Sequence, residues 1–169
     1  TPAETQPASV ERPQYHISAE LDDSQRNLLV VEEIHFTNPS GSALESLPLA
    51  VEANRYPGAF EWLGASAAQR KVTLESLDAN QLLVRLSPAL AAGAAMTLRL
   101  EFRLQLPPIL TGQPHIFGYT SRQINLADWY PILPHFNPVE GWLLHPPGAV
   151  GEHGVYPAAN CEIELHLPP

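Results

Sequence analysis

Hydrophobic and polar residues alternate along several stretches of the chain, which is the pattern of half-buried β-strands. In residues 96–106, Met, Leu and Phe take every second position, and Thr, Arg, Glu and Gln lie between them. These residues would span about 35 Å when extended, so we predict a central strand of a sheet. Similar alternation in residues 15–21 and 28–37, around the polar turn 22–27, predicts a hairpin.

The same pattern predicts further strands on both sides of the long one. Residues 47–51 alternate, and Pro48 fits either an edge strand or the start of a strand, because proline cannot donate to a sheet ladder. Residues 71–77 and 81–86 predict a second hairpin, and residues 161–167 predict a closing strand. Residues 55–69 are less regular: Tyr56, Phe60 and Trp62 fit core anchors in a loop, and residues 65–69 fit a helical turn. We therefore predict an all-β fold: an antiparallel or mixed β-sandwich, or a saddle of several sheets, with long Pro-rich crossings.

The segment 125–142 differs from every other part of the chain. It contains two Trp, one Tyr, one Phe and three Pro. Proline fixes φ and lacks a backbone donor, which excludes a continuous helix or strand, while the aromatic rings favour burial. We predict an ordered crossing that is either a rigid connection between two sheets or one wall of a binding cleft. Its structural or cleft-wall residues are Trp129, Tyr130, Pro131 and Trp142.

Composition narrows the classes of partner. The chain is 44% hydrophobic and 16% charged, which is typical of a folded globule. Its net charge of -9 argues against nucleic acid and against an anionic membrane surface as partners. No apolar run approaches the roughly 20 residues of a membrane span, so we expect no direct membrane insertion.

The first thirteen residues are rich in Thr, Ala, Pro, Glu and Gln, a composition that cannot build a core. We predict a flexible linker over residues 1–13 and one β domain over residues 14–169 that is truncated at its C-terminus. A chain cut just behind a secretion signal or a lipid anchor would begin with such a segment, and so would a chain trimmed for other reasons. The expectation is therefore an exported or envelope-attached protein.

The sequence contains no recognisable catalytic or metal-binding motif. None of the seven His residues is followed by Glu, so the His-Glu-x-x-His zinc motif is absent. His145, Glu152 and His153 could converge on a metal, but they fit solvated loop residues better. Cys161 is the single cysteine; it excludes an internal disulfide and is interpreted as a small buried hydrophobic residue. Neither a Gly-x-Ser-x-Gly elbow nor a P-loop occurs.

Several segments together resemble the N-terminal β domain of the M1 zinc aminopeptidases, the family of alanyl aminopeptidase and leukotriene A4 hydrolase. The resemblance covers most of residues 15–169, and it rests on the order and spacing of its pieces. These pieces are residues 15–21, 33–38, 47–56 and 86–93, then Trp129-Tyr130-Pro131, Leu133-Pro134, Trp142, Gly151-Glu152 and the last strand with Pro168.

The resemblance implies a saddle of β-sheets that packs against a downstream thermolysin-like catalytic domain. In the family that domain carries the Gly-x-Met-Glu-Asn and His-Glu-x-x-His motifs, and neither occurs in this chain. This chain would then hold no cofactor, and zinc would belong to the catalytic domain of the parent. The implied partners are that catalytic domain and a peptide substrate. Gln123 is the implied contact for the substrate's free amino group, although the usual Thr-Gln-x-Glu-Pro context is missing.

Two alternatives remain at the level of sequence. The chain could be a stand-alone carbohydrate- or peptide-binding β-sandwich with Trp129, Tyr130 and Trp142 as an exposed aromatic platform. It could also be an interaction domain from a non-catalytic relative of the family. Burial of the rings favours a scaffold, whereas coplanar exposed rings favour binding.

Overall fold

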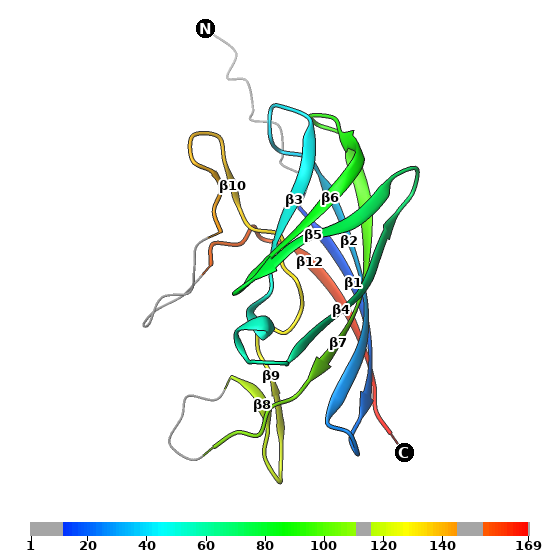
Figure 1. Ribbon diagram of the computed structural model, residues 1–169, viewed down its shortest axis with the longest axis vertical. Helices are drawn as coiled ribbons and strands as arrows, with labels where there is room; N and C mark the ends of the chain where they lie inside the picture. The colour runs from blue at the N-terminus through cyan, green and yellow to red at the C-terminus, as the bar shows by residue number, and fades with distance from the viewer. Residues whose placement is uncertain (1–11, 111–115, 145–153, 169) are drawn as a thin grey trace, which may run out of the picture.

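The computed structural model describes residues 12–110, 116–144 and 154–168. Within these ranges the chain is built from strands and one short 3-10 turn, which confirms the predicted all-β fold (Figure 1). The elements are β1 (Gln14–Asp22), β2 (Asn27–Thr37), β3 (Leu44–Ala50), η1 (Glu52–Arg55), β4 (Phe60–Ala67), β5 (Lys71–Asp78), β6 (Gln81–Leu90), β7 (Ala95–Gln105), β8 (Phe117–Tyr119), β9 (Ile124–Leu126), β10 (Phe136–Asn137), β11 (Gly141–Trp142) and β12 (Asn160–His166).

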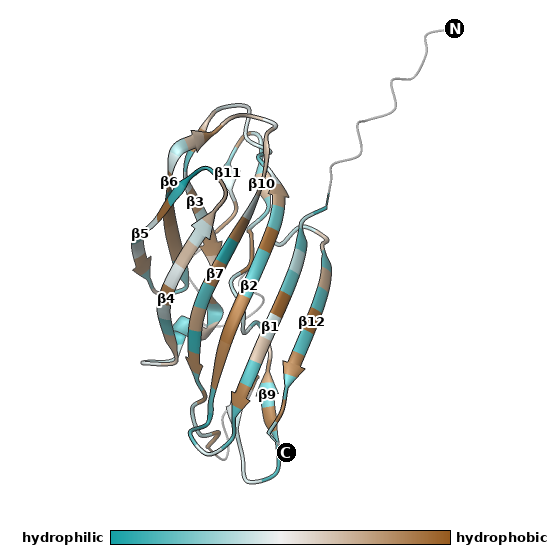
Figure 2. Cartoon of the chain, turned by 90° about the vertical axis from the view of Figure 1, so that its right-hand side faces the viewer, coloured by the Kyte–Doolittle hydropathy of each residue, from teal (hydrophilic) through white to brown (hydrophobic). Residues whose placement is uncertain are grey.

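Two sheets form the body of the molecule. The large sheet has the strand order β12-β1-β2-β7-β4, and Figure 2 shows it face-on. Neighbouring strands in it are antiparallel, except that β12 runs parallel to β1. The small sheet has the order β3-β6-β5, and two further strand pairs, β8–β9 and β10–β11, lie outside these sheets. The sheets are therefore mixed and antiparallel, as the alternation predicted.

The core lies between the large and the small sheet. Every second side chain of β7, from Met96 to Leu104, is buried, and the residues between them are largely exposed. Phe102 is fully buried, and its ring stacks on Phe60 of β4 with 5.2 Å between the centroids. The small sheet contributes Leu47, Leu49, Leu82 and Val84 to the same cluster. Alternation along each strand thus places one apolar face of each sheet against the other.

The predicted positions of two strands are confirmed. β7, predicted as a central strand, lies between β2 and β4, and β3, which carries Pro48, is an edge strand of the small sheet. In the ambiguous stretch 55–69, residues 60–67 form β4 and pair with β7, so the helical turn expected at 65–69 is replaced by the end of a strand. Residues 56–59 form a loop, and Tyr56, Phe60 and Trp62 pack in or against the core as expected. The register of the β4–β7 pairing shifts between Trp62 and Gly64, and this irregularity interrupts the alternation that would have marked a strand.

The interpretation of Cys161 as a buried residue is wrong. Cys161 is exposed on β12, although its partner in the ladder, Tyr15 of β1, is buried. β12 is the outermost strand of the large sheet, beyond the part that the core fills. Alternation identified the apolar face of this strand correctly, but it could not show whether another layer covers that face.

Candidate functional site

The aromatic segment crosses between the two sheets. Ile132 and Ala50 exchange two backbone hydrogen bonds of 2.8 Å, so the segment pairs with the outer edge of β3. Trp129, Pro131 and Leu133 are buried around this contact. The crossing therefore extends the small sheet and closes the side of the sandwich that lies opposite the β4–β5 connection.

Tyr15 fixes the other side of the crossing to the large sheet. The backbone N–H of Leu133 donates a hydrogen bond of 3.0 Å to the Tyr15 hydroxyl oxygen, and both groups are buried. The ring of Tyr130 packs on Tyr15 with 5.9 Å between centroids. Burial raises the pKa of the Tyr15 hydroxyl well above its ordinary value, whereas the hydrogen bond from Leu133 opposes the shift. Tyr15 is thus a neutral acceptor that holds the crossing in place.

We expect Tyr15→Phe to destabilise the protein by about 1–3 kcal/mol, because the buried N–H of Leu133 would lose its acceptor. Chemical denaturation of both proteins measures the difference. Tyr56→Phe is the matched control, since the structure records no hydrogen bond to the Tyr56 hydroxyl within the described residues, and its ring only packs against Phe117. Equal losses for the two variants would contradict a specific role for the Tyr15 hydroxyl.

The four predicted aromatic-segment residues do not form one exposed platform. The Trp129 and Tyr130 rings meet edge-on at 86°, and Trp129 is 7% exposed. Trp142 lies in a second cluster on β11, where its ring meets Phe136 at 69°. Sugar-binding platforms need exposed and coplanar rings, whereas Trp129 is buried and the rings within each of these two clusters are steeply inclined to each other. The structure therefore disfavours the carbohydrate-binding alternative in the form that the sequence suggested.

Trp142 instead lines an apolar groove of about 360 Å³ beside the β10–β11 hairpin. Apart from Thr37 and His135, the described lining residues carry no polar side-chain groups except the indole N–H of Trp142. Such a groove suits an apolar side chain better than a charged ligand. Its lining rings and prolines are Phe36, Phe136, Trp142, Pro13, Pro39, Pro134, Pro138 and Pro157.

Gln123 lies in the turn of the β8–β9 hairpin, and its side chain is exposed. Thr120 organises this turn: its hydroxyl oxygen accepts hydrogen bonds from the backbone N–H groups of Arg122 (3.2 Å) and Gln123 (3.1 Å). The Thr120 N–H donates in turn to the Gln123 carbonyl oxygen at 2.8 Å. The Gln123 amide nitrogen donates to Asn125 Oδ1 at 3.2 Å, which leaves the amide oxygen directed to other donors.

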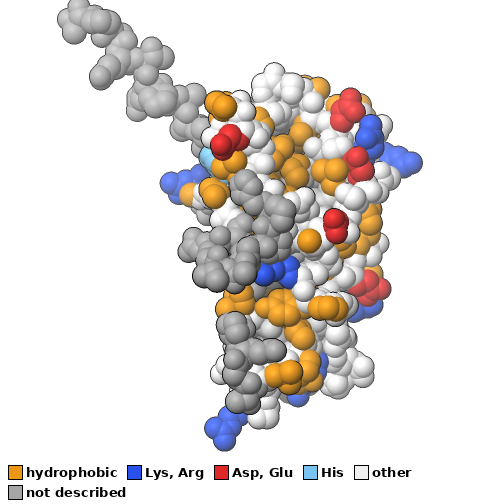
Figure 3. Space-filling model, turned by 60° about the vertical axis from the view of Figure 1, so that its left-hand side comes forward, with side chains coloured by type: hydrophobic (Ala, Val, Ile, Leu, Met, Phe, Trp, Pro, Cys, Tyr) orange, Lys and Arg blue, Asp and Glu red, His pale blue; other side chains and the backbone are white. Residues whose placement is uncertain are grey.

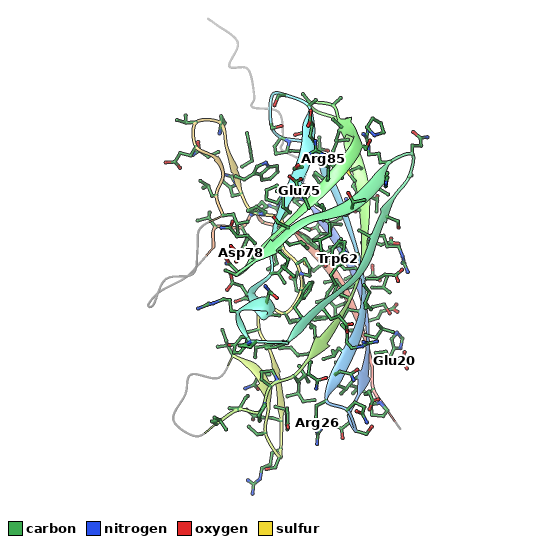
Figure 4. All side chains as sticks on the ribbon, viewed as in Figure 1. Glu20, Arg26, Trp62, Glu75, Asp78 and Arg85 are labelled. Atoms are coloured by element: carbon green, nitrogen blue, oxygen red, sulfur yellow. The ribbon has the colours of Figure 1, made fainter. Side chains whose placement is uncertain are left out.

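The β8–β9 hairpin is attached to the large sheet through its first strand. The guanidinium of Arg26, labelled in Figure 4, lies 5.1 Å from the centre of the Tyr119 ring. Tyr119 also exchanges backbone hydrogen bonds with Pro107 and Ile109. Gly118 is required at this contact, because its φ is +132° and a Cβ there would collide with the Pro107 carbonyl oxygen. These contacts fix the base of the turn that presents Gln123.

The candidate residues lie in separate places. Figure 1 shows the β8–β9 hairpin with Gln123 at one end of the molecule and the β10–β11 hairpin with Trp142 at the other. On the face that Figure 3 presents, hydrophobic side chains gather in the lower part, at the level of the β8–β9 hairpin. Leu110 and Ile116, which precede β8, are 58% and 50% exposed. An exposed apolar surface therefore adjoins the hairpin that carries Gln123.

The sequence analysis missed Glu32, the most unusual residue of the core. Its side chain is fully buried, and neither carboxyl oxygen has a hydrogen-bond partner within the described residues. Burial raises its pKa well above the ordinary value, so the protonated form is favoured. The signal was present in the sequence, because Glu32 occupies an inward position between Val30 and Ile34 of β2.

The described residues provide no group of three or more His, Cys, Asp or Glu side chains that could hold a metal ion. His145, Glu152 and His153 lie outside the described ranges, as do residues 1–11 of the predicted linker. Among the described residues there is also no helix with the length and apolar character of a membrane span.

Comparison with known proteins gives structural matches only. No protein-family profile matches the sequence, and no curated protein matches it. A two-domain M1 zinc metallopeptidase mutant bound to L-tryptophan matches 63% of this chain with a TM-score of 0.46 and 16% identity. The M1 zinc metallopeptidase from Deinococcus radiodurans matches 69% with a TM-score of 0.45 and 16% identity, and a mutant of it bound to a Tyr-Ser-Ala substrate matches 62% with a TM-score of 0.46 and 15% identity. The matched parts span 22%, 24% and 22% of those chains.

Proposed function

We propose that this chain is the non-catalytic N-terminal β domain of a zinc-dependent M1-type aminopeptidase. In the full-length parent it packs beside the catalytic domain and forms one wall of the peptide-binding cleft. The observation that carries the proposal is the position of Gln123, whose exposed amide lies in the turn of an anchored hairpin shortly before the crossing 129–133. The sequence resemblance assigns the contact with the substrate's amino group to this part of the chain.

The chemistry of Gln123 suits a free peptide N-terminus. The side-chain carbonyl oxygen is a hydrogen-bond acceptor, and a protonated α-amino group is a strong donor. The hydrogen bond from the Gln123 amide nitrogen to Asn125 orients the side chain so that this oxygen remains available. A residue that accepts from the amino group selects peptides with a free N-terminus and fixes their register in the cleft.

The residues described in this chain do not fit a zinc site, because no sufficient ligand group occurs among them. In this proposal the zinc ion and the groups that carry out hydrolysis belong to the catalytic domain of the parent, as the sequence resemblance implies. The contribution of this chain is limited to binding and positioning of the peptide. The Leu133–Tyr15 hydrogen bond and the Ala50–Ile132 pairing attach the crossing to both sheets. In the proposal the sheets stay fixed while the hairpin that carries Gln123 contacts the substrate.

The full-length protein provides the test of the proposal. We expect its reading frame to encode His-Glu-x-x-His on a helix downstream of Pro169, and the purified protein to contain one zinc per chain and to release N-terminal residues in a chelator-sensitive manner. A full-length parent that lacks the motif, zinc and activity would refute the proposal that it is a zinc-dependent aminopeptidase. It would favour the alternative, in which the chain is an interaction domain of a non-catalytic relative.

Gln123→Ala in the full-length parent should reduce kcat/KM for peptides about ten- to one-hundredfold, the effect of losing one hydrogen bond to a charged group. Steady-state kinetics on a peptide with a free N-terminus measures this loss. Gln25→Ala is the matched control, because Gln25 is also an exposed glutamine in a hairpin turn, between β1 and β2. Equal kinetics for the Gln123 variant and the control would remove Gln123 from the binding site.

The groove at Trp142 favours a second candidate function, the binding of an apolar peptide segment by this domain alone. Titration of the isolated chain with short apolar peptides, followed by Trp fluorescence, distinguishes the two. If the isolated chain binds such a peptide and Trp142→Ala abolishes this binding, the second candidate function is supported. Zinc content and peptidase activity of the full-length parent test the aminopeptidase proposal independently of this titration.

A further inference from the structure

The apolar groove at Trp142 lies where the N-terminal segment joins the fold. Pro13, the residue before β1, is buried and lines the groove together with Trp142. Its carbonyl oxygen accepts a hydrogen bond of 2.9 Å from the backbone N–H of Asn160, which fixes it beside the start of β12. Figures 1 and 2 show the start of β1 and the β10–β11 hairpin at the same end of the molecule. Residues 1–11 are therefore attached to the fold at the groove.

The groove has room for a further apolar side chain. Phe136 and Trp142 meet edge-on with 5.2 Å between their ring centroids, and both residues are only half-buried. Phe36 and Leu133, which are buried, continue the apolar lining of this space of about 360 Å³. An aliphatic side chain placed there would remove the exposed parts of the two rings from water, which is favourable.

The sequence before Pro13 supplies such a side chain at a suitable spacing. Val10 is the one large aliphatic residue among residues 1–11, and Pro7 precedes it by three positions. Pro-rich chains favour the polyproline II conformation, which has about three residues per turn and rises about 3.1 Å per residue. In this conformation Pro7, Val10 and Pro13 would lie along one side of the chain. Val10 would then be about 9 Å from Pro13, close enough to enter the same groove.

The charged residues next to Val10 do not oppose this placement. Glu11 and Arg12 lie between Val10 and Pro13, and in the polyproline II conformation they would occupy the other two sides of the chain. Arg12 is exposed, so its charge stays in water. No charge has to be buried when Val10 enters the groove, and aromatic-lined grooves are a common binding surface for chains in this conformation.

We propose that residues 7–11 of this chain bind in the apolar groove, with the Val10 side chain against Phe136 and Trp142, and so block it to other apolar peptides. This inference rests on the second candidate function, because it names the occupant of the same groove, and it is independent of the aminopeptidase proposal. A segment of the same chain meets the groove at a millimolar effective concentration, so modest contacts are sufficient. Residues 1–6 then form the flexible part of the predicted linker.

Nuclear magnetic resonance of the 169-residue chain tests the position of Val10 without any substitution. We expect nuclear Overhauser contacts between the Val10 methyl groups and the ring protons of Phe136 and Trp142. Absence of these contacts would overturn the proposal. A mixed sample of two differently labelled copies shows whether the contacts arise within one chain. Contacts between the copies would place the segment of a second molecule in the groove and would also overturn the proposal.

Val10→Asp should open the groove, because a carboxylate is costly to bury among apolar side chains. The probe is a labelled peptide with the sequence of residues 5–13, and its binding is followed by fluorescence anisotropy. It should bind the variant at least tenfold more tightly than the natural chain, the change expected when the segment fills the groove about nine-tenths of the time. Ser9→Asp is the matched control, since it adds the same charge on another side of the segment and should leave the affinity unchanged.

The possible results separate this inference from the second candidate function. Equal affinities of the natural chain and Val10→Asp for the peptide would overturn the inference, and so would an equal gain in Ser9→Asp. A Val10→Asp chain that binds other short apolar peptides but not the peptide of residues 5–13 would overturn only the inference. A Val10→Asp chain that binds neither kind of peptide at millimolar concentration would refute the second candidate function and this inference together. Zinc content and peptidase activity of the full-length parent do not depend on any of these results.

Discussion

Phe102→Ala should destabilise the protein by about 3–5 kcal/mol, the usual cost of removing a fully buried aromatic side chain. Phe102 lies in β7, the strand that pairs with both β2 and β4, and its ring is fully buried. The substitution removes the stack on Phe60 and leaves a cavity between the large and the small sheet. Because the free energy of unfolding of such domains is about 5–15 kcal/mol, the variant should lose a large part of its stability.

Equilibrium denaturation in urea or guanidinium measures this loss as a lower midpoint with an unchanged slope. Phe102→Leu should cost less, since it retains more of the buried volume. Arg103→Ala, in the same strand but on the exposed face, controls for strand propensity and should change the stability by no more than about 1 kcal/mol, the value of its surface ion pair with Glu61. Similar losses at positions 102 and 103 would contradict the packing that places the core on one side of β7.

The alternation of residues was sufficient to predict the strands that line the core. β1, β2, β6 and β7 each place apolar side chains at every second position, and each has one buried face. The spacing of side chains along an extended chain is a local property, so it can be deduced from sequence. The position of β3 at an edge is one of the two that Pro48 allows, because the missing N–H is a property of that residue alone.

Features that depend on contacts between distant segments could not be predicted. Cys161 has the spacing of a buried residue, and only the strand order shows that β12 lies beyond the covered part of the sheet. β4 was not recognised, because the register shift near Gly64 breaks its alternation and its pairing with β7 is long-range. The hydrogen bond between Tyr15 and Leu133 joins residues 118 positions apart, and no local sequence pattern predicts such a contact.

In the candidate site, too, local features could be predicted from the sequence and contacts between distant segments could not. The composition of segment 125–142 predicted an ordered crossing, and the structure shows residues 129–133 in contact with both sheets. The separation of Trp129 and Trp142 into two clusters follows from the short β10–β11 hairpin, whose two-residue strands gave no periodic signal. The exposure of Gln123 depends on the Thr120 turn, which became apparent only with the hydrogen bonds in view.

Glu32→Leu should stabilise the protein at neutral and alkaline pH. Glu32 is fully buried without a hydrogen-bond partner in the described part of the chain, and burial raises its pKa well above the ordinary value. Above the ordinary pKa of a glutamate, the unfolded chain releases this proton while the folded chain retains it. The folded state then binds more protons than the unfolded state, so the free energy of unfolding falls as pH rises. The slope from this residue is about 1.4 kcal/mol per pH unit until the pH passes the raised pKa of the folded state.

Denaturation at a series of pH values separates the charge from the polarity of this side chain. Glu32→Leu removes both, so its advantage over the natural protein should grow with pH above the ordinary glutamate pKa. Glu32→Gln removes the ionisation but keeps a buried polar group, so it should abolish the pH slope and give less stability than leucine at every pH. Glu33→Gln, on the exposed face of the same strand, should leave the slope from Glu32 in place. A Glu32→Leu protein that is less stable than the natural one at pH 8 would instead show that the carboxylate is paired in the folded state.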